Sequence, residues 1–359
     1  MFILQKNMQP QLIHKDRKKV IIWLSTCLFL VSLMVLLGGY TRLSGSGLSI
    51  TSWKPIHGII PPIDDAEWME EFSAYKATPQ YNLVNKGMEL ADFKVIFWPE
   101  FWHRVLGRTV GFVFFLPLLI FATRGSFSRQ FFLRLTGIFA LGGLQGAIGW
   151  IMVKSGLADL PYVSPIKLAL HLSTAFAIFT LILWAILDVV NGGWWSVAGE
   201  KEIKKPSTIH HSPFTTYYFF LTLLAVQIIF GALVAGSHAG LLYNTWPSMN
   251  GGFLPDGIFA QPLMQNLGLI QFIHRNLAIL VAIGFPLWWL ANRTFIKQNR
   301  LNRICIVVFS LIFAQFALGV ATLILQVPLP IALAHQMNAL LLWAAAVWLW
   351  YKIKALLTR

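Results

Sequence analysis

The sequence has little charge. Only 12% of its 359 residues are Asp, Glu, Lys or Arg, whereas 57% are hydrophobic. Soluble domains carry about 25% charged residues, so this chain has too few to cover a water-facing surface of its own size. This shortage excludes a soluble enzyme and a disordered chain, and it predicts a polytopic membrane protein.

Cysteines and acidic residues are also scarce. The two cysteines, Cys27 and Cys305, lie inside apolar runs and suit neither a zinc site nor a disulfide framework, so we interpret them as packing residues. The 14 acidic residues against 28 Lys and Arg leave a net charge of +14. The basic residues form short clusters between apolar runs, as the positive-inside rule expects, and we therefore predict no nucleic-acid partner.

Eight apolar stretches are long enough for the roughly 20 residues that a membrane-spanning helix needs. They are 20–40, 103–123, 135–153, 168–190, 215–237, 272–292, 304–325 and 331–351. Pro328 and Pro330 divide the last two, which lie in a stretch without Asp, Glu, Lys or Arg. The predicted fold class is all-α, with eight transmembrane helices.

The basic clusters orient these helices. The segment before the first span, the loops after the second, fourth and sixth spans, and the C-terminal tail hold 18 of the 28 Lys and Arg, whereas the loop 239–268 has none. Both termini are therefore expected in the cytoplasm. The first apolar run is too long for a cleaved signal, and the N-terminus lacks transit-peptide character, which favours a bacterial inner membrane. In the long outer loop, Pro61, Pro62 and Asp64 predict the start of a short amphipathic helix at the membrane interface.

The chain contains an internal repeat. Segment 37–62 is identical to segment 230–255 at seven positions without gaps. Three further pairs of segments align: 100–106 with 271–277, 144–149 with 314–319, and 165–171 with 330–335. We interpret the chain as two parallel four-helix bundles. The expected domains are a cytoplasmic N-terminal segment (1–19), an N-terminal half (20–190) with the outer loop 41–99, a cytoplasmic linker (191–214), a C-terminal half (215–351) and a cytoplasmic tail (352–359).

Four of the nine histidines occupy matching places in the two halves. His103, His171, His274 and His335 each stand near the start of an even-numbered span, and thus at one depth near the outer face. Two inward histidines in a four-helix bundle are typical of a haem held by two axial ligands, so the pattern predicts two haem sites. Histidines bonded to loop carbonyls, or a proton relay, are the alternatives. Zinc is disfavoured, because only Glu100 is available as a further ligand.

The other five histidines carry weaker signals. His14, His210 and His211 fall in polar inner segments and are expected in water. His57 and His238 lie in outer loops and are not repeat partners, which favours loop roles over ligation.

Charged neighbours distinguish the two predicted sites. Arg104 and Arg275 follow the first histidine of each pair and are expected either to bind a haem propionate or to extend to the membrane interface. Glu100 precedes His103 by three residues and so shares its helix face, whereas Gln271 takes that place in the second half. The asymmetry favours chemistry at the first site alone. An acid that stabilises a helix N-terminus is the alternative.

Glycines cluster in the spans near these histidines. They are Gly38, Gly39, Gly142, Gly143, Gly146 and Gly149. Such glycines either allow close helix approach or leave room for a flat macrocycle, and close approach is the commoner reason.

The patterns GGYTRLSGSGLSITSWKPIHGIIPP, EFWHRVLGR, LALH, QFIHR and AHQ together resemble the haem A synthase family, in the branch of mitochondria and Gram-negative bacteria. The resemblance covers residues 20–351. It implies oxidation of the C8 methyl group of haem O to the formyl group of haem A. Some members of the other branch carry a cysteine pair in an outer loop, which this chain lacks, so a loop thiol step is not expected.

The resemblance also implies roles for residues. His274 and His335 match the axial ligands of a haem b cofactor, while His103 and His171 match the pair at the substrate haem, with Glu100 as the acidic residue of that site. Glu100 would transfer protons or stabilise a cationic intermediate. The bilayer, haem O synthase, an electron donor and a second copy of the chain are the expected partners.

Two other functions share the histidine pattern. A di-haem b-type cytochrome serving quinones would use both pairs but would not need Glu100 in one half alone. A haem or ion transporter built from a parallel repeat is disfavoured, because the membrane centre holds little charge that could mark a path.

Overall fold

The computed structural model describes residues 10–52, 57–158, 160–192 and 213–357, without the side chains of 10–15, 57 and 357. These residues form helices and loops, and their only β-type pairing is an isolated bridge between Met249 and Gly252. The predicted all-α class is confirmed. The predicted linker 191–214 falls almost wholly outside the described residues, as do His210 and His211.

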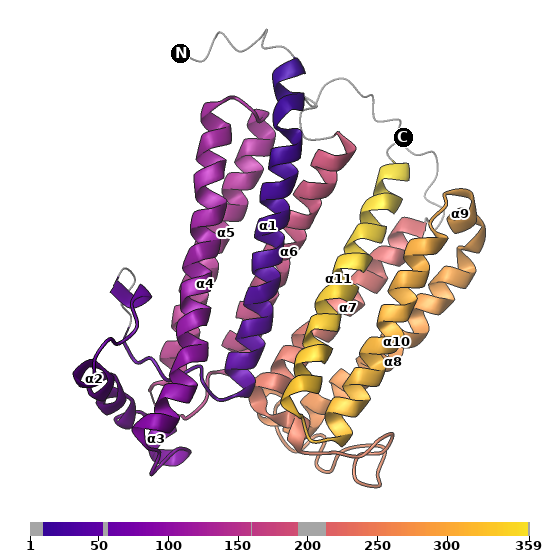
Figure 1. Cartoon of the computed structure of the whole chain (residues 1–359). Helices are drawn as coiled ribbons and strands as arrows, with labels where there is room; N and C mark the ends of the chain where they lie inside the picture. Colours follow the sequence, from indigo (N-terminus) through magenta and orange to yellow (C-terminus); the bar gives the residue numbers. More distant parts are fainter. Residues whose placement is uncertain (1–9, 53–56, 159, 193–212, 358–359) are drawn as a thin grey trace.

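Within the described residues, eight helices are long and apolar enough to cross a membrane, which confirms the eight predicted spans (Figure 1). They are α1 (Pro10–Leu43), α4 (Leu90–Thr123), α5 (Arg129–Gly156), α6 (Pro165–Asn191), α7 (Pro213–Ser237), α8 (Leu267–Ala291), α10 (Asn302–Ile324) and α11 (Leu329–Leu357). The shorter elements are η2 (His57–Ile59), α2 (Asp65–Lys76), α3 (Pro79–Leu83), η3 (Ala239–Leu241), η4 (Leu263–Gln265) and α9 (Arg293–Gln298).

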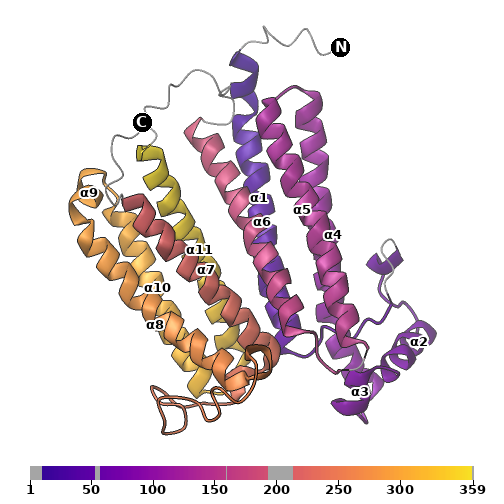
Figure 2. The ribbon, with the colours of Figure 1, turned by 180° about the vertical axis from the view of Figure 1, so that it is seen from behind.

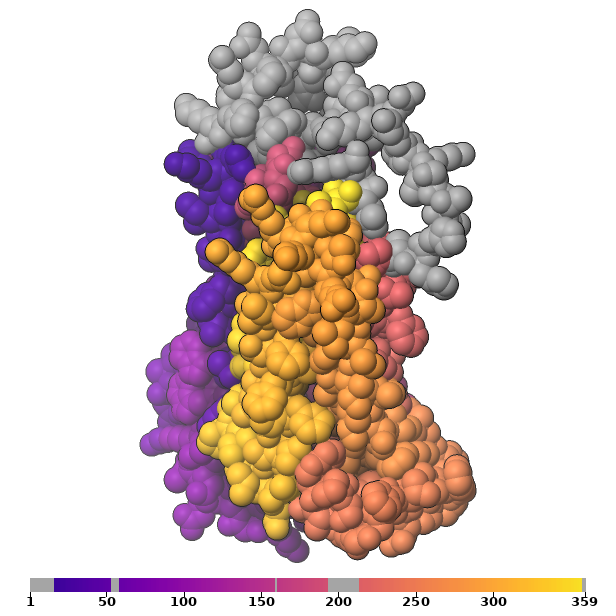
Figure 3. Space-filling view, turned by 90° about the vertical axis from the view of Figure 1, so that its right-hand side faces the viewer, coloured from indigo at the N-terminus to yellow at the C-terminus, as the bar shows by residue number. Residues whose placement is uncertain are grey.

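The long helices form two bundles that lie side by side (Figures 1 and 2). The first contains α1, α4, α5 and α6, and the second contains α7, α8, α10 and α11. Between the bundles, α1 and α6 pack against α7 and α11. Figure 3 shows the side of the second bundle that points away from the first bundle, with the loop between α7 and α8 at the bottom.

Each bundle has an apolar core at the end that carries the chain termini. In the first bundle this core contains Trp23, Phe121 and Ile182, and in the second it contains Tyr217, Phe285 and Ile353, all of them buried. The opposite end of each bundle holds the histidines and many glycines. Burial of apolar area at the end with the chain termini thus stabilises the bundles, and the opposite end combines smaller apolar clusters with the polar groups.

Helix α4 begins at Leu90, well before the predicted start at 103. Pro99 lies inside the helix, although proline normally ends one because it lacks an N–H and crowds the preceding turn. The extension is stabilised by packing. Phe93 and Phe97 contact Trp68 and Phe72 of α2 in a separate buried cluster.

The predicted short helix after Pro61 and Pro62 is α2. Its N-terminus is capped by Asp64, whose side chain accepts a hydrogen bond from the Glu67 N–H at 2.9 Å. Its aromatic residues Trp68, Phe72 and Tyr75 pack on the start of α4 inside the protein, whereas Met69 is exposed.

Candidate functional site

The four histidines lie at the end of the bundles opposite the chain termini. In the first bundle His103 comes from α4 and His171 from α6; in the second His274 comes from α8 and His335 from α11. Each of the four side chains is half-buried. The two members of each pair are close enough to interact electrostatically. The fold therefore brings together the pairs that the sequence predicted.

Each histidine ring packs against a glycine on the neighbouring helix. A Cβ placed on Gly38 would lie 3.1 Å from His103 Nε2, and one on Gly149 would lie 2.9 Å from His171 Cε1. In the second bundle the distances are 3.1 Å from Gly231 to His274 Cε1 and 3.0 Å from Gly319 to His335 Cε1. The four rings thus fill spaces that only glycine leaves open.

The other glycines that cluster near the histidines in the sequence fall into two groups. Gly39 is closely approached by Gln336, whereas a Cβ on Gly142, Gly143 or Gly146 would meet nothing within 4 Å. Close helix approach within this protein is therefore the wrong explanation for these three. Their open space is compatible with the alternative prediction, room for a flat ligand.

We expect Gly149→Ala to displace the His171 ring and Gly146→Ala to leave it in place. The added methyl group clashes with the ring in the first variant, which costs about 1–3 kcal/mol of folding free energy. In the second it meets open space and raises helix propensity by about 1 kcal/mol. Thermal unfolding and the absorption spectrum of purified protein measure both effects. Equal unfolding temperatures and equal spectra of the two variants would contradict the contact between Gly149 and the His171 ring.

Two glutamines hold the second histidine of each pair. Gln145 Nε2 on α5 donates to the His171 carbonyl at 2.9 Å and lies 3.4 Å from His171 Nε2. Gln315 Nε2 on α10 lies 3.3 Å from both ring nitrogens of His335, and its Oε1 accepts from Asn338 Nδ2 at 2.8 Å. These glutamines were not among the site residues predicted from the sequence. They stand in aligned segments, 144–149 and 314–319, which is the signal that could have identified them.

The histidines fit the axial positions of a haem. His171 Nδ1 and His274 Nδ1 are buried and meet no hydrogen-bond partner in the structure, so both rings keep unused bonding capacity. Among the described residues there is no group of three or more His, Cys, Asp or Glu that could hold a metal ion. Two imidazoles from facing helices are sufficient for haem iron, because the macrocycle supplies the other ligands.

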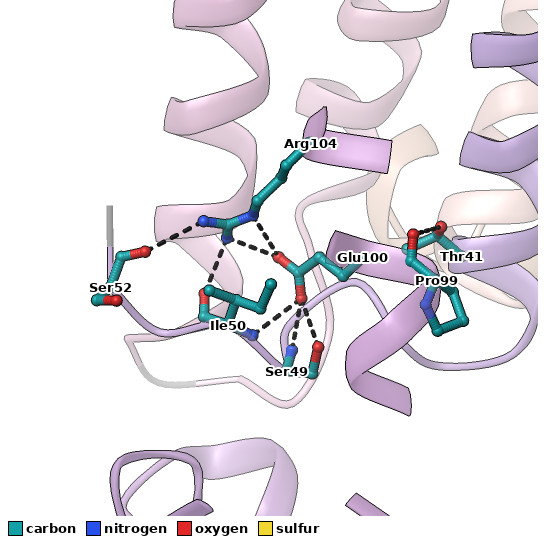
Figure 4. Close-up of polar contacts among 7 residues, drawn as sticks. All are labelled: Thr41, Ser49, Ile50, Ser52, Pro99, Glu100 and Arg104. Atoms are coloured by element: carbon teal, nitrogen blue, oxygen red, sulfur yellow. Dashed lines mark hydrogen bonds and ion pairs between the residues drawn. The ribbon is translucent and has the colours of Figure 1, made fainter. Parts of the chain in front are cut away.

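Glu100 is buried and engaged through both of its oxygens (Figure 4). Oε2 accepts hydrogen bonds from the Ser49 N–H at 2.7 Å, the Ser49 hydroxyl at 2.8 Å and the Ile50 N–H at 3.0 Å. Oε1 accepts from Arg104 Nη2 at 2.6 Å and Nε at 3.1 Å. The carboxylate thus anchors the loop after α1 beside His103.

The alternative role for Glu100, at a helix N-terminus, is wrong. Because α4 begins at Leu90, Glu100 lies inside the helix, where the first-turn dipole no longer acts. In the second bundle Gln271 Nε2 donates to the Tyr243 carbonyl at 3.1 Å instead. The carboxylate is therefore particular to the first bundle, as predicted.

Arg104 and Arg275 fasten the corresponding loops. Arg104 donates to the carbonyls of Ile50 at 2.8 Å and Ser52 at 3.1 Å. Arg275 donates to those of Tyr243 at 2.5 Å, Thr245 at 3.0 Å and Ser248 at 3.2 Å. Both guanidinium groups thus bind loop backbone inside the protein rather than extending to the membrane interface. Their predicted pairing with propionates stays a prediction.

His238 lies apart from the pairs, at the junction of the bundles. Its ring packs on Tyr162, with centroids 4.4 Å apart. Desolvation and the nearby Arg42 lower the pKa of His238 to about 4, so its ring is neutral at pH 7. This placement supports the loop role predicted for His238. The side chain of His57 lies outside the described residues.

Comparison with known proteins places the chain in a family. Residues 21–347 match the COX15-CtaA family, described as cytochrome oxidase assembly protein. A protein of Nitrosospira multiformis named heme A synthase is 41% identical over 345 residues, which cover 94% of each chain.

A second relative with the same name, from Methylobacterium radiotolerans, is 47% identical over 327 residues, covering 89% of this chain and 85% of the relative. A third, from Brucella anthropi, is 42% identical over 345 residues, covering 95% and 93%. Because the match spans nearly the whole chain and includes all four paired histidines, the protein belongs to the COX15-CtaA family of cytochrome oxidase assembly proteins.

Proposed function

We propose that this protein is an oxidoreductase that converts the C8 methyl group of haem O into the formyl group of haem A. The observation that carries the proposal is the arrangement of two histidine pairs, each ring set against a glycine, in a chain whose relatives are named heme A synthase. The family match does not favour the di-haem cytochrome or the transporter.

The two pairs take different roles in this proposal. His274 and His335 would hold haem b, and His103 and His171 would hold haem O. Haem b supplies one-electron redox chemistry when bound. The assignment follows Glu100, since a carboxylate lies beside the first pair and an uncharged glutamine takes its place beside the second.

Glu100 is suited to charge stabilisation at the substrate. Its two oxygens already accept five hydrogen bonds, three of them from Ser49 and Ile50 and two from Arg104. The carboxylate is thus held fixed in a buried site, where a preorganised charge acts strongly. To accept a proton, it would first have to release one of these donors. We therefore favour stabilisation of positive charge over proton transfer.

The repeat and the membrane orientation belong to the same proposal. The glycine–histidine contacts and the bonds of Arg104 and Arg275 to aligned loop carbonyls support a repeat of two parallel bundles. The basic clusters support cytoplasmic termini in a bacterial inner membrane, with both sites near the outer face. Haem O synthase, an electron donor and a second copy of the chain are the proposed partners.

Extraction of the haems from purified protein tests the function. We expect haem B together with haem O, haem A or a hydroxylated form of haem O, separated by chromatography and identified by mass. Haem B alone, at two per chain, would favour a di-haem cytochrome. A protein without haem would contradict both functions.

A further inference from the structure

Gln336 connects the two bundles directly beside the histidine pairs. It follows His335 on α11, and its side chain lies on α1 of the other bundle. Its Nε2 donates to the Val35 carbonyl at 2.6 Å. A Cβ on Gly39 would lie 2.7 Å from Gln336 Cδ, so α1 has room for this side chain only because residue 39 is glycine.

The same turn of α1 contacts the first histidine pair. Gly38, the neighbour of Gly39, is the residue against which His103 packs. The contacts therefore run without interruption from His335 through Gln336 to Gly39, and from Gly38 to His103. His335 is bonded along the chain to Gln336, whose side chain contacts Gly39. Gly39 is bonded along the chain to Gly38, which contacts the His103 ring.

The repeat has a contact that corresponds to the one between Gln336 and Gly39, and this second contact is apolar. Leu172 follows His171 as Gln336 follows His335, and Ala232 aligns with Gly39. Leu172 packs against the buried cluster that contains Ala232. Of these two aligned positions, only Gln336 thus joins the bundles by a hydrogen bond.

We propose that Gln336 is a positioning residue that sets the rate of electron transfer between the two histidine sites. The inference rests on the proposed function and adds to it that one electron passes between the sites: ferrous iron held by His274 and His335 would lose it, and ferric iron held by His103 and His171 would gain it. By bonding to α1 within one turn of the residue that His103 contacts, Gln336 holds this turn of α11 in place and so contributes to the separation and orientation of the two sites.

Gln336→Leu tests this inference, because Leu172 shows that leucine is accommodated at the aligned position. In purified protein carrying both haems, a light-activated ruthenium reductant delivers one electron, and its transfer is followed by absorbance. We expect the rate to fall about three-fold or more, because loss of the bond that positions α11 on α1 changes the distance and orientation between the two sites. Haem content and the absorption spectra should not change, and Gly39→Ala should lower the rate in the same way.

Thr180→Val is the matched control. It removes another hydrogen bond between the bundles, from Trp343 Nε1 to Thr180 Oγ1 at 2.7 Å, more than two helical turns from His171. We expect it to lower thermal stability as much as Gln336→Leu does but to leave the transfer rate unchanged. The inference is overturned, and the proposed function is not, if Gln336→Leu carrying both haems transfers the electron at the normal rate. The same holds if Thr180→Val lowers the transfer rate as much as Gln336→Leu does. A protein that holds no haem overturns the proposed function as well.

Discussion

Glu100→Gln is expected to leave both haem sites loaded and to lower haem A formation by about 100-fold or more, the usual effect of losing an acid–base or charge-stabilising group. The variant keeps an oxygen that can accept from the Ser49 and Ile50 amides but removes the negative charge. Haem A formed per minute by purified enzyme supplied with haem O and an electron donor measures the effect.

The second bundle shows that glutamine is tolerated at this position. Gln271 stands in the aligned place, and Arg275 still holds its loop carbonyls. Ser49→Ala is the control for loop anchoring, because it removes one hydrogen bond from Glu100 and keeps the carboxylate. If Glu100→Gln makes haem A at the normal rate, the catalytic role is wrong. If Ser49→Ala is equally impaired, Glu100 acts by holding the loop.

His274→Ala and His103→Ala are expected to empty different sites. Loss of His274 should remove haem B from the purified protein, and loss of His103 should leave haem B and remove the substrate haem. In the proposed function each variant would lose one of two iron–imidazole bonds, and haem A formation should fall below detection in both. Pigment extraction and the reduced-minus-oxidised spectrum separate the two cases.

His238→Ala is the control for these variants, since His238 lies outside both pairs and packs on Tyr162. It should keep both haems. Loss of haem B from His103→Ala but not from His274→Ala would reverse the assignment of the sites. Loss of all haem from both single variants would show that the bundles load their haems together.

Some of the fold was predictable because membrane-spanning helices depend on local composition. Each of the eight spans is apolar over the length that a bilayer requires, whatever its neighbours are. The residues at which the helices begin were less predictable, as α4 shows. The rule that Pro99 ends a helix is local, and packing of Phe93 and Phe97 against α2 outweighs it.

The histidine pairs were predictable because ionisable residues are rare in apolar helices and these four recur in aligned segments. The contacts that hold these residues in place were not predictable. That Gly149 faces His171, that Gln315 reaches the ring of His335, and that Glu100 binds the loop after α1 all depend on which helices become neighbours.

The sequence by itself thus determined the membrane class, the number of spans, the four histidines and the single acidic residue beside them, since composition and repetition along the chain are enough for each. The tertiary structure decided how these residues are held. It placed Glu100 inside a helix with both oxygens bonded, and it set Gln336 between the bundles. Such contacts join residues far apart in the chain, so they arise only when the helices pack.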